Sequence, residues 1–194
     1  MNSREKILAA VKKNQPATEA LPSLQAIDAI RFENAPEKFK TVLEGIGGVL
    51  LNTSDLQQVA AFVKSNFKEG DKYVTSVAGL EGIPEANPED DPHTLEDVEV
   101  AVVNGAFAVA ENSAIWITAS SLKTRVLPFI CQHLVVILKA ENIVHNMHEA
   151  YERLAGENYD YGVFIAGPSK TADIEQSLVL GAHGPKSMTV FLLT

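Results

Sequence analysis

Apolar residues follow two spacings along this chain. Where they recur every three or four positions they predict amphipathic helices, because such residues share one helix face. These stretches are residues 3–13, 36–44, 55–67 and 141–154. Short continuous apolar runs predict buried strands instead. The runs are residues 49–51, 73–76, 98–103, 107–110, 114–118, 134–138, 164–165 and 189–193.

The order of these elements indicates the fold class. Helices and strands alternate, which favours an α/β fold with an open, mostly parallel sheet and crossover helices. Residues 14–24 lose the periodicity and contain Pro16 and Pro22, so they predict a linker. We therefore expect an N-terminal helix and linker over residues 1–30 and one α/β domain over residues 31–194.

A short polar segment joins two of the predicted strands. Glu111, Asn112 and Ser113 lie between the apolar runs 107–110 and 114–118, which predicts a tight hairpin. The hairpin would place all three side chains at the end of a sheet. Asn and Ser are also frequent in turns for conformational reasons alone. The segment is therefore either a simple turn or part of a site.

Composition narrows the function classes. The 194 residues carry a formal net charge of −9, which disfavours nucleic acids and anionic membrane surfaces as partners. We find no apolar run of membrane-spanning length and no signal-peptide pattern. The single cysteine, Cys131, cannot support a disulfide framework, an iron–sulfur cluster or a cysteine-based zinc site. These features predict a cytoplasmic protein without a metal site.

The last thirty residues hold the densest group of reactive side chains. A Gly-Pro break ends a strand, and Ser169, Lys170 and Thr171 follow before a predicted helix. Backbone donors at a helix start, together with these side chains, can bind an anion. Asp173 and Glu175 would already balance the positive helix end, which favours a small carboxylate, or a ligand that offers hydroxyls, over a polyphosphate. In the alternative interpretation these residues only cap the helix.

His183 lies in an unusual frame between Gly181 and Gly184. Glycines on both sides allow the backbone to turn sharply and to approach a ligand closely. A histidine there can act as an acid, a base or a hydrogen-bond donor near neutral pH. His183 is therefore a candidate catalytic residue, and both glycines are candidate ligand-binding residues.

The order of these residues resembles a known family. Residues 167–175 (GPSKTADIE) and 178–185 (LVLGAHGP) closely resemble the C-terminal signature of the LUD domain, the lactate-utilization protein C family. The resemblance extends to residues 104–111 (NGAFAVAE) and to the strand 134–138, and it covers residues 95–194 well. It implies a fold like the NagB/RpiA/CoA-transferase group, an open α/β sheet with helices on both faces.

The resemblance also implies a function. It links the chain to the oxidation of lactate to pyruvate together with two partner subunits, which carry the iron–sulfur and redox machinery. This chain would bind no cofactor itself, and it would hold a small carboxylate or a partner at a site from Ser169 to His183, with Glu111 facing it. The family usually reads Ala-Glu-Thr-Gly-Thr where residues 110–114 read AENSA, so the glutamate is kept and the Thr-Gly-Thr is lost.

Two other functions stay open. A free-standing CoA-transferase-like or sugar-phosphate enzyme could use Glu111 as its nucleophile or base, because Glu111-Asn112 resembles the Ser-Glu-Asn-Gly stretch around the nucleophilic glutamate of CoA-transferases. A regulatory or interaction protein could use the same fold without catalysis. The identity of the ligand and the formation of a homo-oligomer are not determined by the sequence.

Overall fold

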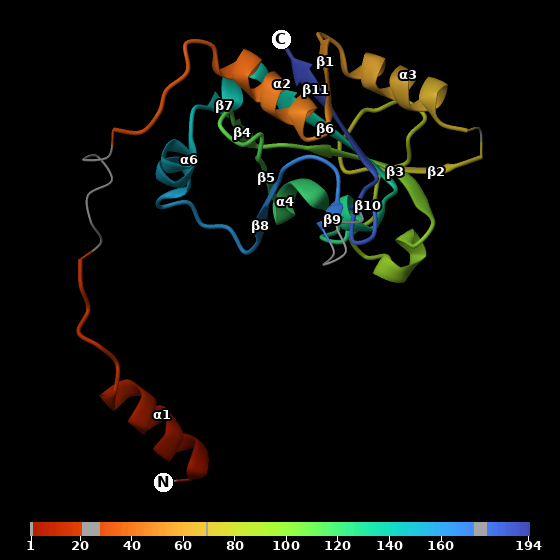
Figure 1. Ribbon diagram of the computed structural model, residues 1–194. Helices are drawn as coiled ribbons and strands as arrows, with labels where there is room; N and C mark the ends of the chain where they lie inside the picture. The colour runs from red at the N-terminus through yellow and green to blue at the C-terminus, as the bar shows by residue number, and fades with distance from the viewer. Residues whose placement is uncertain (1, 21–27, 69, 173–177) are drawn as a thin grey trace.

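The body of the protein contains two sheets. Its structure is a computed structural model that describes residues 2–20, 28–68, 70–172 and 178–194 (Figure 1). The larger sheet has five strands in the order β1-β11-β6-β3-β2, and every neighbouring pair is parallel. The predicted parallel α/β sheet is therefore confirmed. Its strands are β1 (Val49–Thr53), β2 (Lys72–Thr75), β3 (Val98–Asn104), β6 (His133–Lys139) and β11 (Ser187–Leu193).

Strand β6 lies at the centre of the larger sheet and is buried on both faces. Val135 and Ile137 pack into the hydrophobic core on one face of the sheet, and Val136 packs into the core on the opposite face. This alternation follows from the two-residue period of a strand. One face is covered by α3 (Leu56–Asn66), and the other by α2 (Ala35–Gly45), α4 (Ala119–Leu122) and α5 (Leu127–Ile130).

The smaller sheet was not predicted as a separate unit. Its order is β7-β4-β5-β8, and it contains the predicted hairpin, in which Phe107 pairs with Trp116. One face of this sheet packs into the larger core, and the other carries Phe107, Trp116 and Phe164. The strands are β4 (Phe107–Val109), β5 (Ile115–Thr118), β7 (Ile143–Val144) and β8 (Gly162–Ile165).

The helix predicted over residues 141–154 begins later than expected. Residues Ala140–Asn142 form a 3-10 turn (η3), strand β7 follows, and α6 covers only Met147–Leu154. The N-terminal cap explains this start, because the Asn146 Oδ1 accepts a hydrogen bond of 3.0 Å from the Glu149 N–H.

Helix α1 (Ser3–Lys13) matches its predicted range, and Asn2 caps its N-terminus. All of its residues are exposed, and α1 lies apart from the two sheets in Figure 1. The chain is held by the body at Ile30, whose carbonyl accepts a hydrogen bond of 2.8 Å from Asn146 Nδ2. The division between arm and domain at residue 30 stays a prediction.

Residues 79–94, an acidic segment between β2 and β3, are largely irregular and lead into a 3-10 helix, η2 (Pro92–Leu95). In the described part of the chain, no helix combines the length and the apolar character needed to cross a membrane.

Candidate functional site

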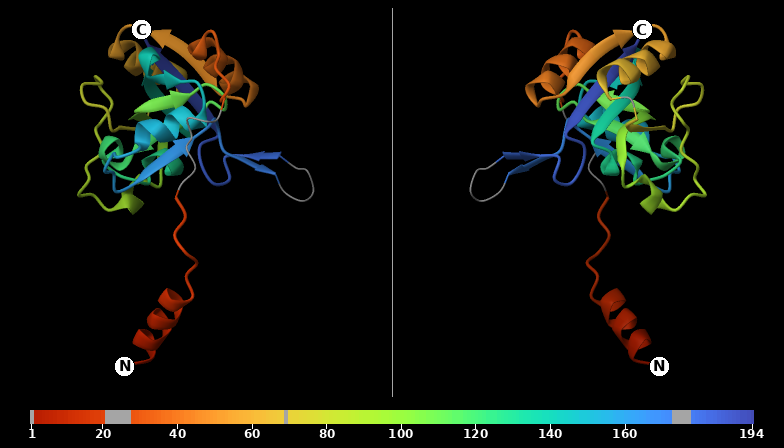
Figure 2. Two further views of the ribbon diagram at one scale, coloured as in Figure 1. Left: turned by 90° about the vertical axis from the view of Figure 1, so that its left-hand side faces the viewer. Right: turned by 90° about the vertical axis from the view of Figure 1, so that its right-hand side faces the viewer.

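The C-terminal motif forms a β-hairpin rather than a strand followed by a helix. Strand β9 (Lys170–Ala172) pairs antiparallel with β10 (Leu178–Leu180), and the two strands project away from both sheets (Figure 2). The helix predicted to follow Thr171 is therefore wrong at Ala172, which belongs to strand β9. The apolar run 178–180 supplies a partner strand, and Thr171 Oγ1 donates a hydrogen bond of 3.1 Å to the Val179 carbonyl. Asp173 and Glu175 lie outside the described residues.

The base of the hairpin brings several predicted site residues together. The Ser169 N–H donates to the Pro185 carbonyl at 2.8 Å, and the Gly181 N–H donates to the Ser169 carbonyl at 3.1 Å. Gly184 packs so closely on Ser169 that a Cβ at Gly184 would lie 3.2 Å from the Ser169 Cβ. Gly181 has a φ of +80°, a left-handed conformation that favours glycine. These glycines are therefore required by the close approach of the two chain segments.

The charged residues of the motif lie at the surface of this base. Lys170 and His183 are both exposed. The Lys170 ammonium is near the end of α2, 3.7 Å from the place that a Cβ on Gly47 would occupy. Lys170, Thr171 and His183 thus surround the foot of a projecting hairpin, and their ligand-binding or catalytic roles stay predictions.

Glu111 has a structural partner. Its Oε1 accepts a hydrogen bond of 3.0 Å from the Met147 N–H, which is the first residue of α6. A carboxylate at the start of a helix satisfies a free backbone donor and balances the helix dipole. The contact therefore gives Glu111 a role in holding α6 against strand β4.

The expectation that Glu111 faces His183 is not met. The Glu111 N–H donates to the His145 carbonyl, and His145 Nδ1 accepts from the Phe32 N–H just before α2 begins. The hairpin base lies at the opposite end of α2, where a Cβ on Gly167 would be 2.7 Å from Ile46 Cδ1. An 11-residue helix is about 16 Å long, so α2 separates the two places.

The rest of the segment behaves as a turn. The Asn112 Oδ1 accepts a hydrogen bond of 3.0 Å from the Ala114 N–H, as Asn side chains do in tight turns. Ser113 has a φ of +55°, and its buried hydroxyl has no hydrogen-bond partner in the described part of the chain. The family usually has glycine at this position, and a left-handed backbone is the physical reason to prefer it. The loss of the Thr-Gly-Thr sequence is thus accommodated in the turn.

A cavity at the carboxyl ends of the parallel strands was missed by the sequence analysis. It has a volume of about 370 Å³ and opens where β3, β6 and β11 end. Asn104, Lys139 and Asn142 supply its polar groups. Open α/β sheets bind ligands at the carboxyl edge of their strands. Polar residues directly after the predicted strands could therefore have indicated this cavity from the sequence. The other lining residues are Leu56, Val77, Gly105, Ala106, Ile137 and Leu193.

Lys139 is central to this edge. It also lines a second cavity of about 400 Å³ together with Ser54, Glu141 and Thr194. Its ammonium is 3.9 Å from a Glu141 carboxylate oxygen, and both side chains are largely exposed. Such a long, exposed ion pair leaves the ammonium able to bind an anion. The described residues contain no cluster of three or more His, Cys, Asp or Glu side chains suited to a metal ion.

Comparisons with known proteins agree with the C-terminal motif. A protein named lactate utilization protein C from Bacillus pumilus (strain SAFR-032) is 30% identical over 115 residues, which cover 56% of this chain and 48% of the relative. The protein of the same name from Shouchella clausii (strain KSM-K16) is 33% identical over 104 residues, 50% of this chain and 45% of the relative. This chain spans about half the length of the curated relatives it matches.

A solved structure and a family model extend the comparison to the whole fold. The crystal structure of a DUF162 family protein from Deinococcus radiodurans aligns with a TM-score of 0.60 and 16% identity, over 82% of this chain and 96% of that chain. This likeness shows the α/β fold. The model of the LUD domain matches residues 5–193, so this protein belongs to the LUD domain family.

Proposed function

We propose that this protein is a non-redox component of a lactate-utilization system and that its β9–β10 hairpin contacts a partner subunit. The relatives named lactate utilization protein C support the system. The partner subunits would carry the iron–sulfur and redox groups that oxidise lactate to pyruvate. The only cysteine of this chain, Cys131, is buried and supplies no such group.

The observation that carries the contact is the exposure of apolar side chains on the hairpin. Val179 and Leu180 are 48% and 49% exposed on a two-stranded sheet that projects from the body. Exposed apolar groups on a projecting element are typical of surfaces that bind another protein. The family motif also lies at the foot of this hairpin. This position favours a partner that members of the family have in common over a ligand that binds this chain alone.

The partner contact is tested by copurification with the iron–sulfur subunit and by growth on L-lactate. Val179→Glu with Leu180→Glu places two charges on the hairpin, and we expect it to abolish both. Val49→Glu is the matched control, because Val49 is 47% exposed on β1 in the body. Unchanged copurification of the hairpin variant would exclude the hairpin as the contact. Unchanged growth after deletion of the gene would exclude the lactate-utilization role itself.

The cavity at the carboxyl edge of the larger sheet is our candidate for the small carboxylate. Lys139 offers an ammonium, and Asn104 offers an amide donor at the mouth of the same cavity. A hydrogen bond to a charged group contributes about 1.5–3 kcal/mol, so Lys139→Ala should weaken binding at least roughly tenfold. Isothermal titration calorimetry with L-lactate and with pyruvate measures these affinities. Lys64→Ala on α3 is the control, and equal affinities of both variants would reject this cavity.

The geometry gives less support to the alternative of an enzyme that uses Glu111 than to a non-redox component. A nucleophilic carboxylate must be able to reach the substrate, whereas Glu111 Oε1 is held by the Met147 N–H. Turnover by the purified chain alone, lost in Glu111→Gln, would favour the CoA-transferase-like alternative. A purely regulatory role predicts no turnover and no loss of lactate oxidation in a reconstituted system that lacks this chain.

A further inference from the structure

Helix α1 is a folded element without a packing surface. It has 11 residues, a complete capping box between Asn2 and Glu5, and only exposed residues. Isolated helices shorter than about 12–15 residues are marginal in water, because the nucleation cost is not recovered by so few hydrogen bonds. Ile7, Leu8 and Val11 form an apolar stripe on this helix, and they are all exposed. The helix therefore needs an apolar surface to pack against.

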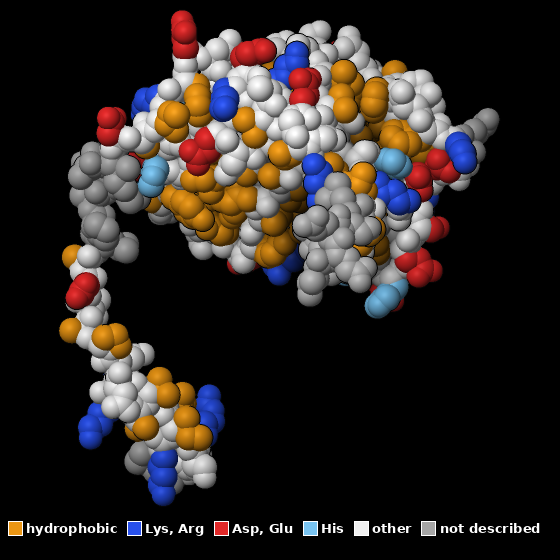
Figure 3. All heavy atoms as spheres, viewed as in Figure 1, with side chains coloured by type: hydrophobic (Ala, Val, Ile, Leu, Met, Phe, Trp, Pro, Cys, Tyr) orange, Lys and Arg blue, Asp and Glu red, His pale blue; other side chains and the backbone are white. Residues whose placement is uncertain are grey.

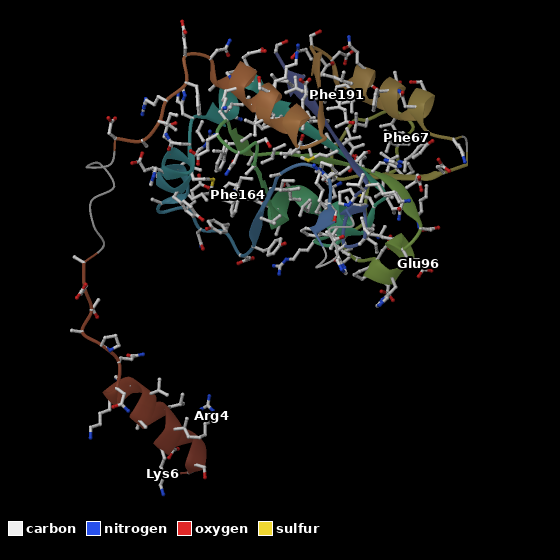
Figure 4. All side chains as sticks on the ribbon, viewed as in Figure 1. Arg4, Lys6, Phe67, Glu96, Phe164 and Phe191 are labelled. Atoms are coloured by element: carbon white, nitrogen blue, oxygen red, sulfur yellow. The ribbon has the colours of Figure 1, made fainter. Side chains whose placement is uncertain are left out.

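The charge of α1 differs from the charge of the rest of the chain. Residues 1–13 contain four basic residues and one acidic residue, a formal charge of +3. The whole chain has −9, so residues 14–194 carry −12. Figure 4 shows two of these basic side chains, Arg4 and Lys6, on opposite sides of α1. Charge complementarity thus favours the body of this protein as the docking surface.

The described part of the body offers an apolar surface with suitable chemistry, which we call the aromatic surface. It consists of Tyr151 on α6, Phe164 on β8 and Tyr159 on the segment between them. Phe164 and Tyr159 contact Trp116, and Tyr151 lies 6.2 Å from Phe164 between ring centroids. Tyr151 and Tyr159 are 58% and 43% exposed. Trp116 lies 4.6 Å from Phe164 and 5.2 Å from Tyr159 between ring centroids. Figure 3 shows hydrophobic side chains gathered over α6 and β8 on this face.

Acidic side chains border the aromatic surface. Glu157 and Asp160 line a cavity of about 370 Å³ together with Tyr159, Thr118 and Ser120. These carboxylates can pair with Lys12, which lies at the edge of the α1 stripe, about 40° from Leu8. Beside them, the Arg125 guanidinium already lies 5.1 Å from the centre of the Tyr161 ring, so aromatic rings in this region accept cations. Arg4 lies on the same helical face as Ile7 and Val11, at about 100° per residue, and can stack in the same way.

The tether is anchored next to this surface. Ile30 is bonded to Asn146 at the start of α6, and Arg31 pairs with Glu149 at 2.8 Å. Helix α6 has 8 residues and is about 12 Å long, so the anchor is within that distance of Tyr151. The 16 residues from 14 to 29 can span up to about 55 Å when extended. A short tether gives an effective concentration in the millimolar range, which favours weak docking within one chain.

From these observations we infer that α1 docks on the aromatic surface of its own chain. Ile7, Leu8 and Val11 pack against Tyr151, Tyr159 and Phe164, while Arg4 meets the aromatic rings and Lys12 meets the acidic border. The docked helix covers the outer side of α6 and β8. This inference is independent of the proposed function, because its residues, on α6, β8 and the segment between them, are not those of the hairpin or of the sheet-edge cavity.

Disulfide trapping in the full chain tests the docking. Leu8→Cys with Tyr151→Cys should form an intramolecular disulfide under mild oxidation, seen as a faster-migrating monomer on a non-reducing gel. Ala9→Cys with Tyr151→Cys is the matched control, since Ala9 points about 200° away from Ile7, and it should form several-fold less. The native Cys131 does not compete, because it is buried and burial raises the pKa of its thiol to about 12. A disulfide-linked dimer, or equal trapping of both pairs, would overturn docking within one chain.

A second measurement leaves the aromatic surface unchanged. Trp116 is the only tryptophan and contacts Tyr159 and Phe164, so its fluorescence reports on this surface. A chain that lacks residues 2–14 is titrated with a peptide of those residues. We expect a saturable change in emission, and at least tenfold weaker binding for the peptide with Leu8→Glu. An emission spectrum that does not respond to either peptide would overturn the inference.

Discussion

At the scale of single residues, Ser113 carries two local costs. Its φ of +55° is unfavourable for a residue with a Cβ, and its buried hydroxyl has no partner among the described residues. The first costs about 1–2 kcal/mol and the second about 1–3 kcal/mol. Glycine removes both but loses roughly 0.5–1 kcal/mol through greater freedom of the unfolded chain. We expect Ser113→Gly to raise the free energy of unfolding by about 1 kcal/mol or more, measured by urea denaturation.

A matched variant separates the two costs. Ser113→Ala removes the hydroxyl and keeps the Cβ in the left-handed conformation, so it should recover only part of the gain. Equal stability of the Gly and Ala variants would show that the backbone conformation is not strained. A loss of stability in both would show that the hydroxyl is bonded in solution.

For Glu111, a pair of variants separates a structural role from a catalytic role. Because Glu111 Oε1 accepts from the Met147 N–H, Glu111→Ala should cost about 1 kcal/mol, as the loss of a helix cap does. Glu111→Gln keeps an acceptor oxygen and should cost much less. Thermal unfolding of both variants measures this difference. An unchanged melting temperature in Glu111→Ala, together with lost activity, would instead assign Glu111 to chemistry.

At the scale of elements, the β9–β10 hairpin is separable from the body. Its two strands pair with each other in a sheet of their own, and the bond from the Gly181 N–H to the Ser169 carbonyl closes its base. Replacing residues 170–180 with a short Gly-Ser linker should therefore lower the melting temperature by less than about 4 °C, equivalent to roughly 1 kcal/mol. Differential scanning calorimetry checks this. A much larger decrease in melting temperature would show that the hairpin stabilises the fold. Hairpin variants could then lose partner binding because they unfold.

The elements that were predictable are those whose pattern is local. Helix α2 and strand β6 have enough residues for a clear period, and their predicted ranges agree with the structure to within a few positions. Strands β7 and β9 have only two and three residues, and they exist because a partner strand from elsewhere in the chain pairs with them. A single short window holds no information on that pairing, so a helix was predicted across β7 and directly after Thr171, within β9.

The candidate site shows the same limit. The sequence grouped Ser169, Gly181 and Gly184 into one site, and the structure brings them together, but the hairpin that does so was not predicted. The separation of Glu111 from His183 depends on where α2 packs across the smaller sheet, and no residue near either of them specifies that. Lys139 follows the strand that was easiest to predict, yet its role at the sheet edge needed the order of the strands.

At the scale of the whole molecule, docking of α1 determines the overall dimensions. A compact chain of 194 residues has a radius of gyration of about 16 Å, whereas an arm that extends from the body increases it. Small-angle X-ray scattering of the intact chain should therefore give a value near 16 Å at low protein concentration. Leu8→Glu places a charge in the apolar stripe of α1 and should increase both the radius of gyration and the maximum dimension.

Ala9→Glu is the control for this experiment. It makes the same change in net charge on the opposite face of α1, so its scattering should match that of the unaltered chain. If the effect came from charge alone, both variants would expand equally, since the body is strongly acidic and repels an added carboxylate. Expansion confined to Leu8→Glu requires that the apolar stripe is buried, because only then does the face of the helix matter. Equal dimensions for the unaltered chain and both variants would mean that α1 does not dock on its own chain in solution. Its apolar stripe would then be a binding surface for a different molecule.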